Sequence, residues 1–95
     1  MEIFLLTKPP QNLRSELCFK LIQRSQDARL YLAGDGVYCL LSGLENILPH
    51  ERTFACMEDM EARGIPRKDG VNACDNFYEK LVEDMMEERN GFYSF

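Results

Sequence analysis

Four cysteines are the residues of this chain whose chemistry could carry a function. Cys18, Cys39, Cys56 and Cys74 stand far apart, no Cys-x-x-Cys pair occurs, and the sequence holds a single histidine, His50. A zinc site is recognisable from sequence when its ligands come in closely spaced pairs, so this spacing argues against zinc. We expect free thiols, because a cytoplasmic compartment keeps thiols reduced. Any chemistry therefore belongs to an isolated thiol.

The elements that position these thiols can be read from apolar runs and their breaks. Residues 30–41, LYLAGDGVYCLL, join two apolar runs of different period through a Gly-Asp-Gly turn. Glycine permits a tight turn, and Asp35 can accept hydrogen bonds from the first amides of a following helix. We expect a strand over 28–33 and a helix over 36–47. A dinucleotide-binding turn would need a third glycine where Cys39 stands, so the turn is interpreted as structural.

The rest of the chain continues this alternation, which is typical of α/β proteins. Asp75 is expected to cap the last helix, and Gly64 to end the third helix in a left-handed conformation. The apolar tail is interpreted as a fifth strand or as an element covered by a neighbouring subunit. The expected strands span 2–7, 28–33, 52–56, 71–74 and 92–95, and the expected helices 12–25, 36–47, 57–63 and 76–89.

These elements give the thiols different environments. Cys18 lies on the apolar side of the first helix, and Cys39 has apolar neighbours, so packing roles are favoured for both. Cys56 falls at the carboxyl end of a strand and the amino end of a helix, at the rim where ligands bind in open α/β sheets. Free helix amides would lower its pKa, whereas carboxylates such as Glu58 and Asp59 would raise it. The sequence leaves the ionisation of Cys56 open.

Length, composition and charge narrow the class of protein. Ninety-five residues, 45% of them apolar, predict one ordered domain over 1–95. The net charge is -5 and the 11 basic residues are scattered, so direct nucleic-acid binding is not expected. The opening run 1–6 is too short for a secretory or membrane-spanning segment, and no other segment approaches ~18 apolar residues. We expect a cytoplasmic protein without a membrane partner.

Several short motifs, taken in order, point to a family. They are FLLTKPP, ELCFKL, GDGVYCLL, FACMEDMEARGI and the aromatic carboxyl tail. Their order and spacing resemble the DsrE/DsrF/DsrH superfamily of small sulfur-relay proteins, and within it the DsrH/TusB branch. The resemblance covers nearly the whole chain. It implies a DsrE-like α/β fold, a three-layer sandwich with a central, largely parallel five-stranded sheet.

The resemblance also implies a function and partners. The chain would carry sulfur as a cysteine persulfide, in tRNA wobble-uridine thiolation or in dissimilatory sulfur metabolism. Its partners would be DsrE/DsrF-like or TusC/TusD-like subunits and a persulfide donor protein, in a homo- or hetero-oligomer. A carrier needs one accessible, moderately acidic thiol and neither a base nor a metal, so no cofactor is expected.

Two cysteines match family positions and are the candidates for the sulfur-carrying residue. Cys18, in ELCFKL, is similar to the first-helix cysteine of DsrH proteins. Cys56 is similar to the active cysteine of the DsrE/TusD branch, at a position where DsrH and TusB chains usually have another residue. Cys39 and Cys74 match no family cysteine.

A second hypothesis is a non-catalytic assembly subunit of a DsrE-family oligomer with buried, inert cysteines. The helix end at Met85 and Met86 and the tail 92–95 would then form the functional surface. The two hypotheses separate on thiol exposure, because a carrier must expose at least one reactive thiol in the folded state.

Overall fold

The computed structural model describes residues 1–41, 50–87 and 89–95, and its centre is one parallel β-sheet. The strand order is β4-β3-β2-β1-β5, and all four neighbouring pairs run parallel. The expected α/β fold with a five-stranded sheet is confirmed, including the fifth strand in the aromatic tail. The strands are β1 (Glu2–Leu6), β2 (Ala28–Leu32), β3 (Thr53–Cys56), β4 (Asn72–Cys74) and β5 (Gly91–Ser94).

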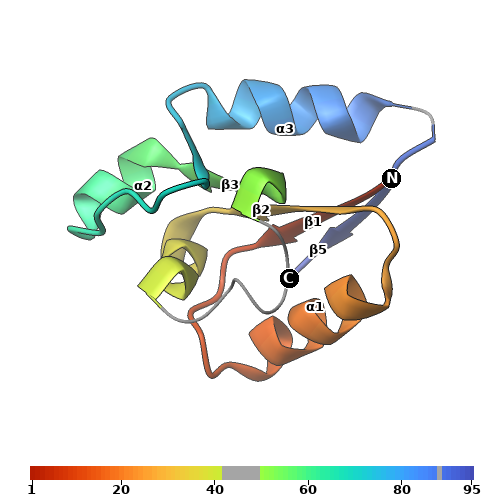
Figure 1. Cartoon of the computed structure of the whole chain (residues 1–95), viewed down its shortest axis with the longest axis horizontal. Coiled ribbons are helices and arrows are strands. Elements are labelled where there is room, and N and C mark those ends of the chain that lie inside the picture. The colour runs from red at the N-terminus through yellow and green to blue at the C-terminus, as the bar shows by residue number, and fades with distance from the viewer. Residues whose placement is uncertain (42–49, 88) are drawn as a thin grey trace.

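Helices cover both faces of the sheet and make a three-layer arrangement (Figure 1). The helix α1 (Leu13–Arg24) packs on one face, and α3 (Phe77–Met86) packs on the other. The short helix α2 (Met57–Ala62) and the 3-10 helices η1 (Gly34–Leu41) and η3 (His50–Arg52) follow or precede the strands at their ends. No helix in the described part of the chain is long and apolar enough to cross a membrane.

The strands β1, β2 and β3 are largely buried on both faces, since successive strand residues point to opposite sides and helices cover each side. Phe4 and Leu30 belong to the core cluster beneath α1, together with Ile22 from that helix. Tyr31 belongs to the cluster beneath α3, together with Phe77 from that helix. The apolar runs of the strands therefore supply two cores, one for each covering layer.

A polar contact anchors α3 to the sheet. The Tyr31 hydroxyl donates a hydrogen bond to the Asp84 carboxylate, and the Arg29 guanidinium binds both oxygens of that carboxylate at 2.9 and 3.1 Å. Burial, followed by the neighbouring carboxylate, raises the pKa of Tyr31, so its hydroxyl remains a donor. This contact sets the position of α3 over β2.

Two predicted helices differ from those in the structure. The Gly-Asp-Gly turn opens directly into η1 instead of an α-helix from Gly36, because its backbone bends tightly against β1: the Ala33 amide donates to the Leu6 carbonyl at 3.1 Å, and the Gly36 amide donates to Ala33 at 2.9 Å. Residues 42–47 of that predicted helix lie outside the described residues. The last helix ends at Met86, three residues before the predicted end.

The predicted cap of the last helix was also wrong. Asn76, not Asp75, is the residue at the cap of α3, and it makes no side-chain cap hydrogen bond. Gly64, by contrast, takes the expected left-handed conformation after α2, with φ of 66°.

The leucines at helical spacing in α1 form an exposed stripe. Leu13, Leu17 and Leu21 are 83%, 50% and 36% exposed, whereas Cys18 and Ile22 face the core. The helix expected over 12–25 is present, but the residues that pack on the sheet lie beside the leucine row. Apolar spacing shows which residues share a face and does not show what covers that face.

We predict that Gly36→Ala destabilises the fold strongly. A Cβ at this position would collide with the Leu6 carbonyl oxygen and lie 2.9 Å from its carbon, and both atoms belong to backbone. The expected loss in the free energy of unfolding, measured by urea denaturation, is about 3 kcal/mol or more. The control is Gly64→Ala, where a Cβ meets nothing within 4 Å and only the positive φ is strained, at a cost of about 1 kcal/mol. Equal losses would contradict the close approach.

Candidate functional site

Cys56 stands at the carboxyl edge of the sheet, between a strand and a helix, as the sequence predicted. It is the last residue of β3 and the cap residue of α2, which begins at Met57. Its side chain is 5% exposed and belongs to the cluster beneath α3. The strand fixes its backbone, and the following helix fixes which groups surround its sulfur.

Opposing influences act on the ionisation of the Cys56 thiol. Burial has the largest effect and raises its pKa. The backbone amides of Asp59 and Glu58 lower it, while the nearby Asp59 carboxylate raises it. The net effect is a raised pKa, so the protonated thiol predominates at neutral pH and the thiolate is a minor form.

Asp59 connects the surroundings of Cys56 to the Gly-Asp-Gly segment. One oxygen of its carboxylate accepts a hydrogen bond from the Gly34 amide at 2.7 Å, and the other lies 3.8 Å from the Arg63 guanidinium. Arg63 also binds Asp35 through two nitrogens, each 3.1 Å from the same oxygen. These contacts tie η1 to α2 beside the thiol. Asp35, expected to cap a helix, thus serves to bind Arg63.

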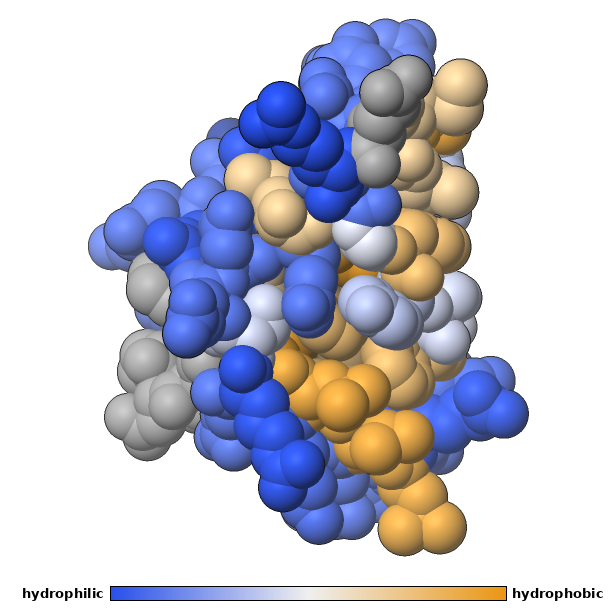
Figure 2. Space-filling view, turned by 90° about the vertical axis from the view of Figure 1, so that its right-hand side faces the viewer, coloured by the Kyte–Doolittle hydropathy of each residue, from blue (hydrophilic) through white to orange (hydrophobic). Residues whose placement is uncertain are grey.

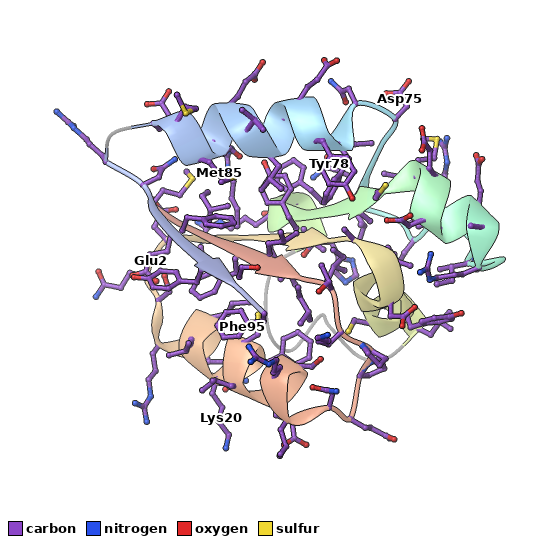
Figure 3. All side chains as sticks on the ribbon, turned by 180° about the vertical axis from the view of Figure 1, so that it is seen from behind. Glu2, Lys20, Asp75, Tyr78, Met85 and Phe95 are labelled. Carbon is purple, nitrogen blue, oxygen red and sulfur yellow. The ribbon has the colours of Figure 1, made fainter. Side chains whose placement is uncertain are left out.

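Tyr78 is a site residue that sequence reasoning missed, because 22 positions separate it from Cys56 in the chain. It lies in the first turn of α3 and points toward the carboxyl end of β3 (Figure 3). Its side chain is 59% exposed. Burial, and then the charges of Asp59, Cys56 and Glu58, raise the pKa of its phenol. Tyr78 is therefore a protonated hydroxyl at the entrance to the Cys56 region.

Cys74 ends the neighbouring strand β4, directly beside Cys56. The two residues are register partners in the parallel β3–β4 pair. Cys74 is partly exposed, whereas the other three cysteines are buried, and it packs against the same cluster as Cys56. Burial raises its pKa most, Lys80 lowers it, and Asp75 raises it. Sequence spacing gave no signal for this pair, because 18 positions separate the two cysteines in the chain.

The structure places Cys18 and Cys39 in the other core, beneath α1. Both side chains are 0% exposed. Burial and the neighbouring Cys39 raise the pKa of Cys18 to about 12, and burial raises that of Cys39 to about 11. The two predicted candidates, Cys18 and Cys56, are therefore not brought together: they belong to clusters on opposite faces of the sheet.

The chemistry that this edge supports is that of thiols. Across residues 1–41, 50–87 and 89–95, no group of three or more His, Cys, Asp or Glu side chains is placed to hold a metal ion. Cys56 and Cys74 offer two nucleophilic sulfurs, with backbone amides beside one of them and the Lys80 ammonium near the other. Such groups favour sulfur exchange.

Comparison with known proteins identifies a family. The family model described as "DsrH like protein" matches residues 8–90, which contain the motifs ELCFKL, GDGVYCLL and FACMEDMEARGI in full. A search of curated proteins found no match to this chain.

We predict that Asp59→Asn makes Cys56 more reactive. The substitution removes the carboxylate charge that raises the pKa of the thiol, while the amide oxygen can still accept from Gly34. At fixed pH near neutrality, alkylation of Cys56 in the folded protein should become severalfold faster, as measured by peptide mass after quenching. The control is Glu58→Gln, since only the backbone of Glu58 contacts the thiol. A slower or unchanged rate in Asp59→Asn would contradict this role of the carboxylate.

Proposed function

This chain belongs to the DsrH-like family of sulfur-relay proteins, and on that premise we propose that it carries sulfur as a persulfide on Cys56. The observation that carries the proposal is the position of Cys56 at the carboxyl end of β3 and the amino end of α2, where the backbone of Asp59 and Glu58 lowers the pKa of its thiol. These backbone amides favour the thiolate that attacks a donor. Cys18 remains the other predicted carrier, but its complete burial and high pKa support Cys56 instead.

The proposed loading step is a thiol exchange. The Cys56 thiolate attacks the outer sulfur of a donor persulfide, a new S–S bond forms on Cys56, and the donor leaves as its thiolate. The acceptor thiol repeats the same attack on the carried sulfur. Because Cys56 is only 5% exposed, loading requires local opening of this edge, where Tyr78 stands.

The same proposal implies a role as a subunit, a cellular compartment and a set of partners. The protein would act as a transferase-like subunit without independent turnover, in the cytoplasm, beside DsrE/DsrF-like or TusC/TusD-like subunits and a persulfide donor protein. Its carried sulfur would serve tRNA wobble-uridine thiolation or dissimilatory sulfur metabolism. The four free thiols suit a reducing compartment.

The test is persulfide loading followed by peptide mapping. The folded protein is incubated with glutathione persulfide, alkylated and digested with trypsin, which releases Cys56 within residues 53–63. We expect this peptide to gain one sulfur atom, and we expect the gain to vanish in Cys56→Ala because no other thiol in the folded chain combines amide contacts with the edge position.

The control is Cys18→Ala, which removes the other candidate and should leave loading of the 53–63 peptide intact. Loading that is lost in Cys18→Ala and kept in Cys56→Ala would move the carrier role to Cys18. A folded protein that gains no sulfur on any peptide would remove the carrier function itself.

A second candidate function, assembly, is favoured by the exposed leucine stripe of α1. Figure 2 shows apolar side chains gathered over the lower part of one side of the molecule, where α1 lies. A groove of about 230 Å³ opens between α1 and the edge strand β5, lined by Leu21, Phe4 and Tyr93 together with the charged Glu2 and Arg24. An exposed row of leucines of this kind is typical of contacts between proteins.

If this surface joins copies of the chain, Leu17→Glu should shift the protein to monomers, because a charge in an apolar interface loses its hydration without a partner. Sedimentation velocity over a range of concentrations measures this. The matched control is Leu41→Glu, an equally drastic change at a side chain that is 64% exposed on η1. Self-association through α1 is rejected if the unmodified protein sediments as a monomer, or if both variants behave like it.

A further inference from the structure

We propose that Cys74 is a resolving thiol for Cys56: it displaces the group that is sulfur-bonded to Cys56 and closes a reversible Cys56–Cys74 disulfide. That the group bonded to Cys56 is a persulfide sulfur rests on the proposed function. The pairing of the two thiols is independent of that function, because it follows from the strand register of the sheet alone. The site would accept sulfur adducts of the persulfide and mixed-disulfide class.

The register of the sheet brings the two residues together. Cys56 and Cys74 are direct partners in the β3–β4 pair. Neighbouring strands lie about 4.8 Å apart, and disulfides form between Cα atoms roughly 4.4 to 6.8 Å apart. Register partners in a parallel pair point to the same face, and both side chains indeed pack in the cluster beneath α3. The backbone spacing and the side-chain direction therefore both suit a bond between the sulfurs.

Because both cysteines lie at strand ends, their backbones can shift enough to bring the two Cβ atoms within bonding distance. β4 is a three-residue strand at the edge of the sheet, and Cys74 is its last residue. Cys56 is likewise the last residue of β3. Beyond them the ladder stops, so the two Cβ atoms can approach without breaking strand pairing. A disulfide formed under such adjustment is expected to be easily reduced, as reversible disulfides are.

Exposure and charge divide the roles within the pair. Cys74 is the partly exposed member, and its Sγ donates a hydrogen bond to the Asn72 carbonyl at 3.5 Å. The Lys80 ammonium favours its thiolate and Asp75 opposes it, while burial raises its pKa most. Cys56 is the sheltered member, 5% exposed. A sheltered sulfur suits the holding of an adduct, and an exposed one suits its displacement.

The chemical step balances without another reactant. The Cys74 thiolate attacks Sγ of Cys56 in its persulfide, the Cys56–Cys74 S–S bond forms, and the bond to the outer sulfur breaks. The outer sulfur leaves as hydrosulfide and takes up the proton that Cys74 released. The Cys74 thiol is oxidised to the disulfide level, the outer sulfur is reduced to sulfide, and Cys56 remains in an S–S bond throughout. With a mixed disulfide on Cys56, the leaving group is the corresponding thiol.

The pair can be tested without a persulfide by using the disulfide reagent DTNB on the folded protein. If one thiol of the pair reacts with DTNB and the other then closes the Cys56–Cys74 disulfide, two thionitrobenzoate anions are released for each chain. No aryl group then stays bound, and the mass of the protein falls by two hydrogen atoms. The product is the same whichever thiol reacts first. Trypsin should then yield a linked pair of peptides, residues 53–63 and 69–80, each of which contains one cysteine.

Two variants show whether Cys74 is a member of the reacting pair. In Cys74→Ala, DTNB should leave an aryl group bound and form no linked peptide. Cys39→Ala is the matched control, since that side chain is 0% exposed and lies in the other core, and it should behave like the unmodified protein. Retained aryl groups in the unmodified protein, or a linked pair that does not contain Cys74, would overturn the inference.

A parallel measurement of sulfide release separates this inference from the proposed function. The sulfur that the 53–63 peptide of the unmodified protein gains on loading should then be lost with time as hydrosulfide, whereas Cys74→Ala should keep its sulfur on that peptide. If DTNB closes the pair but Cys56 never takes sulfur, the resolving pair stands and the carrier function fails. If Cys56 takes up sulfur but Cys74→Ala releases hydrosulfide as fast as the unmodified protein, and DTNB forms no linked peptide pair, the carrier function stands and the resolving role fails.

Discussion

Parallel pairing of five short strands is the constraint on which the rest of this structure depends. All strands run in one direction, so their carboxyl ends meet along one edge and every connection must cross the sheet over one of its faces. The crossings place α1 on one face and α3 on the other. The same pairing brings Cys56 and Cys74, the final residues of β3 and β4, to that shared edge.

A small polar network shapes this edge. The Asp59 carboxylate holds the Gly34 amide, and Arg63 binds both Asp59 and Asp35. The Gly-Asp-Gly and Ala-Arg-Gly segments therefore belong to one structural unit, although 28 residues separate Asp35 from Arg63. The network holds η1 against α2 and leaves Cys56 between backbone amides that favour its thiolate and a carboxylate that disfavours it. The reactivity of the thiol is a balance that the fold sets locally.

Four chemically identical thiols acquire different properties from their depth in the fold. Cys18 and Cys39 are fully buried, and removal from water makes their ionisation costly. They contribute to packing between α1, η1 and the sheet. Cys56 and Cys74 lie at the end of the sheet, where backbone amides and Lys80 partly offset the same cost. Position relative to the sheet edge, more than the neighbours in sequence, separates packing cysteines from candidate reactive ones.

The sequence by itself determined the alternation of strands and helices, the five-stranded α/β fold, the family, and the place of Cys56 between a strand and a helix. These features follow from local periodicity, from turn residues such as Gly64 and from short motifs, all of which are written along the chain. The 3-10 form of η1 was not foreseeable in this way, because it depends on how closely Gly36 approaches Leu6 of another strand.

Only the tertiary structure decided which strands are neighbours, and hence that Cys74 lies beside Cys56 and that Tyr78 faces their edge. It also decided that Leu13, Leu17 and Leu21 face outward although their spacing is that of a packed helix face. The physical reason is common to these cases. Periodicity defines the faces of an element, whereas register and burial depend on which surfaces meet when distant segments pack together.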